Sequence, residues 1–229
     1  MPPKLLKPSI KVNVAGATSL SEQAYRLIRR MIVRLQLAPG AVIREDELQQ
    51  KLGIGRTPIR EALQRLARDQ FLVVLPRRGM IVSSIDVTEL SMLYETRAIL
   101  EPYAARLACQ RGRVEHWTRM RAVLESAKRP GVTPDDLINI DCECHEIVWT
   151  AAGNRFLTDT LDMLYAQSDR LWHMYLAEVA DMGHAVGEHV EILNALESGN
   201  CVLAYQLSEA HVRSFDAQVR QAVTRRISR

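Results

Sequence analysis

The sequence predicts a mainly α-helical fold, with a short β-hairpin in its N-terminal part and an all-helical bundle behind it. Residues 53–66 join a glycine-flanked turn to an amphipathic stretch at helical spacing. Two short β-prone runs follow, and we find no convincing strand later in the sequence. From residue 86 onward, apolar residues recur at helical spacing between glycine- and proline-containing breaks, which favours six or so antiparallel helices.

Two helices are expected before the turn, from Leu20 to about Gln36 and from Glu45 to Leu52. The second carries Leu48 and Leu52 one helical turn apart and stops at Gly53. A third helix is expected over 56–69, with Thr57 as its cap and Pro58 at its first position.

The two sides of the third helix differ in character. Its apolar stripe is Ile59, Ala62, Leu63, Leu66 and Ala67, and its polar stripe is Arg56, Arg60, Gln64 and Arg68. One side can pack while the other reaches a DNA duplex, which is typical of a helix-turn-helix. The runs 71–75 and 80–82 then flank Pro76-Arg77-Arg78-Gly79, which predicts a hairpin with a basic tip and hence a winged helix-turn-helix.

Charge divides the chain in the same place. Residues 1–85 hold 15 Lys and Arg against 6 Asp and Glu, a net charge of +9, and residues 86–229 have a net charge of −6. A compact unit with this positive excess is expected to bind phosphate backbones. We therefore expect a flexible arm over 1–17, a DNA-binding domain over 18–84 and a helical domain over 85–229. The lysines of the arm favour a solvated tail, with DNA contact as the alternative.

Other features restrict the class of protein. No apolar run is long enough to span a bilayer and no secretory signal is evident, so we expect a cytoplasmic protein with no membrane partner. The four cysteines, at positions 109, 142, 144 and 201, give no disulfide framework, and we expect reduced thiols.

The helical domain is expected to start at Asp86–Glu89, with a kink at Pro102. Further helices are expected over 112–128, 133–151, 154–178, 184–198 and 200–226.

Four polar residues of this domain form a candidate metal site. Asp141 and His145 lie four residues apart on one expected helix, so they share a face, and His189 and His211 come from two others. A bundle can bring all four inward as an Asp and three imidazoles. Ordinary partly buried histidines are the alternative. Cys142 and Cys144 are rotated away from the shared face and are expected to pack.

Together these segments resemble a known family. Leu37-Ala38-Pro39-Gly40, residues 56–63 and Arg78-Gly79 resemble the DNA-binding domain of GntR-family bacterial transcription regulators. Downstream, Glu95-x-Arg97-x-x-x-Glu101, Asp141-x-x-x-His145, residues 152–154, Glu188-His189 and His211 resemble the FCD domain of one GntR subgroup. The resemblance implies a divalent metal ion, zinc, nickel or manganese, on the Asp and three His, which helps hold a small organic acid effector.

Roles follow for individual residues. We expect Arg56 and Arg60 to approach bases or phosphates in the major groove, with Thr57 at the DNA backbone. Arg77, Arg78 and Gly79 would form a wing tip on the DNA. In the helical domain, Arg97 would neutralise the effector, the alternative being an ion pair with Glu101, and Arg170 would be a second effector-binding cation. Arg65 and Arg68 are left outside the expected DNA contacts, because a pair with Glu61, one turn before Arg65, is a sufficient structural explanation.

The sequence thus predicts a transcription regulator, not an enzyme, that binds a palindromic operator in double-stranded DNA as a homodimer. A metal-dependent hydrolase is one alternative, but Glu146 and Glu188 point about 100° away from their ligand neighbours, so neither is an obvious general base. A DNA-binding dimer with a purely structural helical domain is the other.

Overall fold

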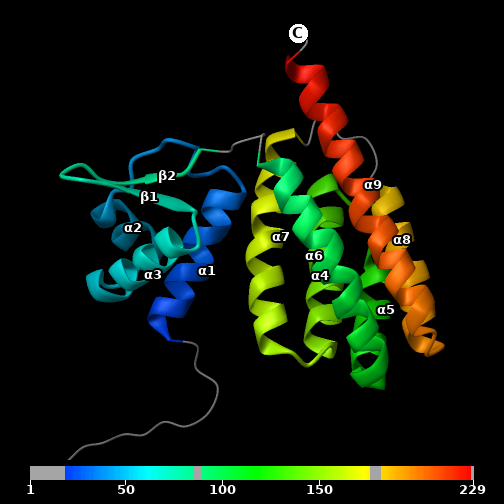
Figure 1. Cartoon of the computed structure of the whole chain (residues 1–229). Coiled ribbons are helices and arrows are strands. Elements are labelled where there is room, and N and C mark those ends of the chain that lie inside the picture. The colour runs from blue at the N-terminus through cyan, green and yellow to red at the C-terminus, as the bar shows by residue number, and fades with distance from the viewer. Residues whose placement is uncertain (1–18, 85–88, 176–181, 228–229) are drawn as a thin grey trace, which may run out of the picture.

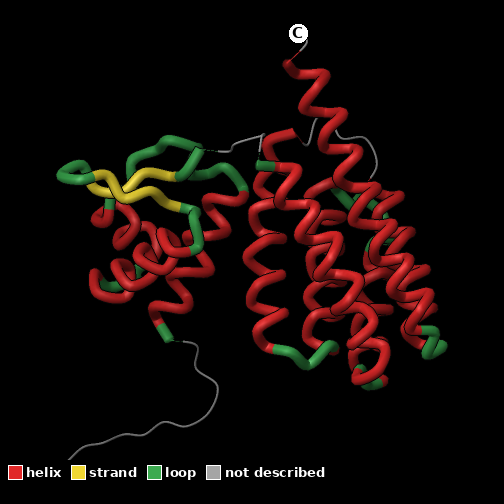
Figure 2. Tube along the Cα trace, viewed as in Figure 1, coloured by secondary structure: helices red, strands yellow, loops and turns green. Residues whose placement is uncertain are grey.

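The computed structural model describes residues 19–84, 89–175 and 182–227. Within these ranges the fold is mainly α, with a two-stranded antiparallel hairpin after the N-terminal helices, and Figures 1 and 2 show the winged part beside the helical bundle. The predicted fold class is confirmed. The arm over 1–17 and most of the expected helix start at 86–89 lie outside the described residues.

The winged part consists of three helices and the hairpin. Its elements are α1 (Leu20–Val33), α2 (Glu45–Leu52), α3 (Arg56–Arg68), β1 (Leu72–Leu75) and β2 (Gly79–Val82). Ser19 caps α1, accepting a 3.1 Å hydrogen bond from the amide of Glu22. The apolar sides of α1 and α3 meet in one core with Phe71 from the start of the hairpin.

Two local predictions in this part were wrong. The cap of α3 is Gly55, and no side chain caps it, so Thr57 and Pro58 lie at its second and third positions. Pro58 is still tolerated there because the first-turn amides have no partner within the helix. Helix α1 ends at Val33 rather than near Gln36, and Leu35 follows with a positive φ of 56°.

The bundle contains α4 (Leu90–Arg111), α5 (Val114–Ser126), α6 (Pro134–Ala151), α7 (Arg155–Tyr175), α8 (Met182–Glu197) and α9 (Cys201–Ile227). Helices α4 and α9 pack along each other, and α7 faces the winged part in Figure 1. Trp149, Met120 and Ile147 are fully buried in its core. Within the described residues, no helix has the length and apolar character needed to cross a bilayer.

One cysteine prediction was wrong. Cys109 at the end of α4 forms a disulfide with Cys201 at the first turn of α9, across a sequence separation of 92 residues. The two side chains meet because α4 and α9 are antiparallel neighbours. Cys142 and Cys144 are free, and Cys144 is buried in the bundle core.

Candidate metal centre and nucleic-acid interface

Helix α6 supplies two of the four candidate ligands, Asp141 and His145. It starts with a reciprocal cap, because Thr133 accepts from the amide of Asp136 while the Asp136 carboxylate accepts from the amide of Thr133. Pro134 occupies the first helical position. The cap fixes where α6 begins, and the 3.6-residue repeat then places Asp141 and His145 on the same inward face.

The four candidate ligands converge in the bundle interior. His189 arrives from α8 and His211 from α9, and all four residues are buried. His189 Nε2 lies 2.8 Å from Asp141 Oδ1, and His145 Nε2 lies 3.2 Å from His211 Nε2. The Nε2 atoms of His145 and His211 each lie 3.7 Å from the Asp141 carboxylate. One potential ligand atom from each residue falls within a group no wider than 4.8 Å.

These separations suit a single divalent ion. A first-row ion binds imidazole nitrogen and carboxylate oxygen at about 2.0 to 2.2 Å, so neighbouring ligands lie roughly 3 to 3.6 Å apart. The measured 2.8–3.7 Å spans this range. Three imidazoles and one carboxylate form a donor set suited to zinc, nickel or manganese. The residues present therefore fit such an ion.

Three further side chains orient the candidate ligands. Glu101 Oε2 lies 2.7 Å from His145 Nδ1, and Glu188 Oε2 lies 2.7 Å from His211 Nδ1. The Tyr165 hydroxyl donates a 2.6 Å hydrogen bond to Asp141 Oδ2. A carboxylate at Nδ1 favours a proton on that nitrogen and leaves Nε2 free to bind an ion.

Burial and neighbouring charges shift the pKa values of several groups at the site. Burial alone would raise the pKa of Glu101, but Arg97 and His145 outweigh it and hold this pKa at about 2. Asp141 also has a lowered pKa, because its three histidines outweigh its burial. Burial lowers the pKa of His189 to about 4. For His211, burial is outweighed by the hydrogen bond to Glu188, and the pKa is raised.

Arg97 lies at the site and forms the ion pair with Glu101 that the sequence analysis gave as the alternative to effector binding. Its Nε donates a 2.5 Å hydrogen bond to Glu101 Oε1, and both side chains are buried. Arg97 also lines a small cavity beside Asp141 and Tyr165, whose free volume of about 10 Å³ has room for one water. A larger molecule can enter only if the lining side chains move.

Arg170, the second expected effector-binding cation, does not line that cavity. Its Nη1 donates to Ser83 Oγ at 2.9 Å and its Nη2 to the Ser83 carbonyl at 2.5 Å, so it joins α7 to the residue after β2. The structure therefore brings together Asp141, His145, His189, His211 and Arg97, and places Arg170 between the winged part and the bundle.

Sequence reasoning missed Glu101, Glu188 and Tyr165 as ligand partners. Glu101 was named in the sequence analysis as the possible ion-pair partner of Arg97, and a carboxylate has a second oxygen that can accept from another donor. Glu188 was named in the Glu188-His189 motif and as a candidate general base, but its pairing with His211 on another helix depends on how α8 and α9 pack. Tyr165 had no signal in the sequence.

The expected DNA-contacting residues are exposed on one part of the molecule. Arg56 and Arg60 in the first turns of α3 share Glu45 of α2, at 3.5 Å and 2.8 Å from its Oε2. Thr57 is exposed beside them. Arg65 pairs with Glu22 at 2.5 Å and lies 3.8 Å from the centre of the Tyr25 ring, so the expected pair with Glu61 was wrong.

The wing tip is a tight turn at the end of the hairpin. Leu75 pairs with Gly79 across the strands, and the Arg78 amide donates to the Leu75 carbonyl at 3.1 Å. Arg77 has a positive φ of 62°, and Gly79 one of 86°. The turn leaves Arg77, Arg78 and Gly79 exposed.

Contacts from α7 connect the bundle to the winged part. Arg29 of α1 forms a bidentate ion pair with Asp162, with Nη2 to Oδ1 at 2.7 Å. Gln167 donates to the Asp69 carbonyl at 3.2 Å. From α6, Asn139 accepts a 2.8 Å hydrogen bond from Arg34.

Known proteins share both parts of this chain. The family model "Bacterial regulatory proteins, gntR family" matches residues 20–82, and the FCD domain model matches residues 92–214. The HTH-type transcriptional repressor RspR of Escherichia coli (strain K12) is 26% identical over 219 residues, covering 93% of this chain and 94% of RspR. The Nta operon transcriptional regulator of Aminobacter aminovorans is 36% identical over 116 residues, covering 50% of this chain and 55% of that protein.

Solved structures show the same fold. E. coli McbR/YncC superposes with a TM-score of 0.78 at 22% identity, covering 90% of this chain and 99% of that one. A metal-free FCD domain superposes with a TM-score of 0.53 at 15% identity, covering 62% of this chain and 99% of that domain. With both family models matching, this chain belongs to the GntR family of bacterial transcription regulators, in the subgroup with a C-terminal FCD domain, and it is a DNA-binding regulator rather than an enzyme.

Proposed function

We propose that this regulator's affinity for its operator is controlled by a small carboxylate effector, bound beside a divalent ion on Asp141, His145, His189 and His211. The observation that carries the proposal is the convergence of one buried carboxylate and three imidazoles, two of which have a carboxylate at Nδ1. A donor set arranged in this way is costly to bury unless it binds something.

The ion would supply open coordination positions for a carboxylate oxygen, since four protein ligands leave two positions on a six-coordinate ion. Zinc, nickel and manganese all suit the ligands. Glu101 holds His145 through Oε2 and Arg97 through Oε1. Arg97 would neutralise the effector, exchanging part of its pairing with Glu101 for the incoming anion.

Helix α7 is the proposed route from this site to the winged part. Tyr165 contacts Asp141, while Asp162, one turn earlier, holds Arg29 of α1. The cavity beside Asp141 has about 10 Å³ of free volume, so an effector must displace some of its lining side chains, and Tyr165 is one of them. A displacement of α7 would change both the Tyr165–Asp141 contact and the Asp162–Arg29 contact. The effector would then bind one arrangement of the winged part and the bundle more tightly than the other.

On the DNA side, we propose that Arg56 and Arg60 read base edges or phosphates in the major groove, with Thr57 at the backbone. Arg77, Arg78 and Gly79 would contact DNA through the wing tip. Glu45 holds both recognition arginines in the free protein, and DNA must displace it. Two copies of the chain would bind a palindromic operator as a homodimer in the cytoplasm.

The test is a thermal-shift screen of small carboxylates on metal-loaded and chelator-treated protein, with metal content measured alongside. An effector held through the ion should raise the melting temperature only while the ion is present. His189→Ala and His211→Ala should lose both the ion and this response. His116→Gln is the control, since His116 of α5 is outside the four-residue group and Gln can still accept the hydrogen bond from the Arg113 amide that caps the helix. Unchanged metal content in both site variants would leave the helical domain with a structural role alone.

A further inference from the structure

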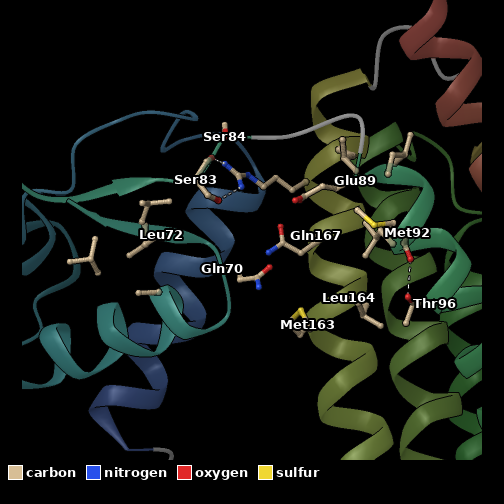
Figure 3. A pocket seen from close by; sticks show the side chains of 17 residues that line it. Gln70, Leu72, Ser83, Ser84, Glu89, Met92, Thr96, Met163, Leu164 and Gln167 are labelled. Carbon is tan, nitrogen blue, oxygen red and sulfur yellow. Dashed lines mark hydrogen bonds between the residues drawn. The ribbon is translucent and has the colours of Figure 1, made fainter. Parts of the chain in front are cut away.

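A groove between the winged part and the bundle has the features of a second ligand site. It encloses about 760 Å³ and is lined from the winged side by β1 and Gln70, and from the bundle side by α4 and α7. Figure 3 shows Gln70 and Leu72 facing Met163, Leu164 and Gln167 across it. It is separate from the cavity at the candidate metal centre.

The groove contains a buried cation, Arg170, that has no counter-ion among the residues that the structure describes. Arg170 is only 1% exposed, and both of its Nη atoms bind Ser83. Its Nε is buried and has no hydrogen-bond partner among the described residues. Within that part of the chain no acidic side chain forms an ion pair with it, and burial lowers its pKa to about 10. A buried charge of this kind is costly unless an anion compensates it.

The rest of the lining is mostly apolar and adaptable. Met92 lies on α4 and Met163 on the neighbouring helix α7, and Met92 is 59% exposed. Flexible methionine side chains make favourable contacts with aromatic rings. Glu89 also lines the groove but is exposed at the start of α4, where solvent screens its charge.

We propose that this groove binds an aromatic carboxylate of one or two rings, with its carboxylate on Arg170 and its ring system between the methionines. This site goes beyond the proposed metal-linked effector and does not depend on it. Because the ligand would contact both β1 and α7, it would act on the arrangement of the winged part and the bundle.

The experiment is isothermal titration of the full chain with 2-naphthoate, with 2-naphthylmethanol as the neutral control ligand. Wild-type protein should bind about one 2-naphthoate per chain, and the neutral ligand about tenfold or more weakly, since a charged hydrogen bond contributes roughly 1.5 to 3 kcal/mol. Arg170→Met should remove this preference, and Met163→Trp should weaken the binding of both ligands, because its indole would occupy the space proposed for the ligand's rings. Arg34→Met is the matched control, because Arg34 also bridges the two parts but binds Asn139 outside this groove.

Treatment with a chelator distinguishes binding at this site from binding at the metal centre. Binding of 2-naphthoate should persist after chelation, whereas an acid held by the ion should be lost. The proposal is overturned if chelation abolishes binding, if Arg170→Met binds 2-naphthoate as tightly as wild type, or if no 2-naphthoate binds. If Arg170→Met does not fold, Met163→Trp and the charged-to-neutral preference in wild type decide the outcome. An absent metal ion would refute the proposed function and leave this site untouched.

Discussion

Tyr165 on α7 donates a 2.6 Å hydrogen bond to Asp141 on α6, so the helix that faces the winged part also touches the candidate metal centre. Tyr165→Phe keeps the ring and removes only this contact. We expect the variant to retain its ion but to show a smaller difference in DNA affinity between metal-loaded and chelated protein. Fluorescence anisotropy with a labelled operator fragment measures this difference. An unchanged difference would exclude Tyr165 from the coupling.

The ion pair between Arg29 and Asp162 should matter for coupling more than for DNA binding. Asp162→Asn removes the charge of the pair while keeping the shape of the side chain. Metal-stripped variant and wild type should bind DNA alike, but the variant's response to metal should shrink. A double-mutant cycle with Arg29→Met isolates the pairwise energy. Additive effects of the two substitutions would show that the pair carries no coupling.

The carboxylates behind the histidines should control affinity for the ion without binding it. Glu101→Gln and Glu188→Gln should each weaken zinc binding by about 10- to 100-fold, because second partners orient ligating imidazoles. Competition with a chromogenic chelator gives the affinities. Glu143→Gln is the control, since Glu143 lies on α6 but pairs with Arg119 at the surface. Equal affinities in all three variants would contradict the assigned role.

Acid should destabilise the metal-free protein through His189. Its pKa is about 4 in the fold, below the ordinary 6.5, so the unfolded chain takes up this proton first. The contribution of His189 to the free energy of unfolding should therefore fall as the pH drops from 6.5 to about 4, while Asp169, whose burial raises its pKa to about 7, acts in the opposite direction over this range. His211 acts above this range, because its pKa is raised: its stabilisation is fully present below pH 6.5 and is lost as the pH rises through the raised value. The contribution of Glu101 is lost at lower pH, from 4.5 toward 2.

Thermal unfolding in chelator across this pH range measures the effect. His189→Asn, which cannot titrate there, should give a shallower dependence between pH 6.5 and 4. Parallel curves for the variant and wild type would show that another group dominates acid unfolding.

Alanine substitutions of Arg60 in α3 and of Arg77 in the wing tip should weaken DNA binding in different ways. Arg60→Ala should cost about 1 to 3 kcal/mol and relax sequence preference if Arg60 reads a base. Arg77→Ala should weaken binding to all sequences evenly and reduce the salt slope by about 1. Anisotropy titrations at several salt concentrations, on operator and mismatched duplexes, distinguish the two patterns. A uniform loss for Arg60→Ala would assign it to a phosphate.

Local sequence determined most of the fold. Helical periodicity located the described helices of the bundle within a few residues, and Gly53 ended α2 in a left-handed conformation as its position suggested. The cap of α3 was misassigned because Gly55 and Thr57 both allow a helix start, and nothing local separates them. The shared face of Asp141 and His145 followed directly from their spacing.

Contacts between distant elements were harder to predict. The Cys109–Cys201 disulfide depends on α4 and α9 lying antiparallel, which spacing alone does not reveal. Arg170 was expected to bind the effector, and its contact with Ser83, the residue after β2, depends on how α7 lies against the winged part. Glu188 likewise meets His211 only through the packing of α8 on α9.

The Cys109–Cys201 disulfide closes a covalent ring that contains Asp141, His145 and His189, while His211 follows outside it. When the oxidised chain unfolds, three potential ligands remain tethered within one loop, so less entropy is lost in gathering them around an ion. An ion that retains affinity for the denatured chain protects the native one less. Added zinc should thus raise the melting temperature more for reduced than for oxidised protein. The size of this increase would then report whether Cys109 and Cys201 are joined.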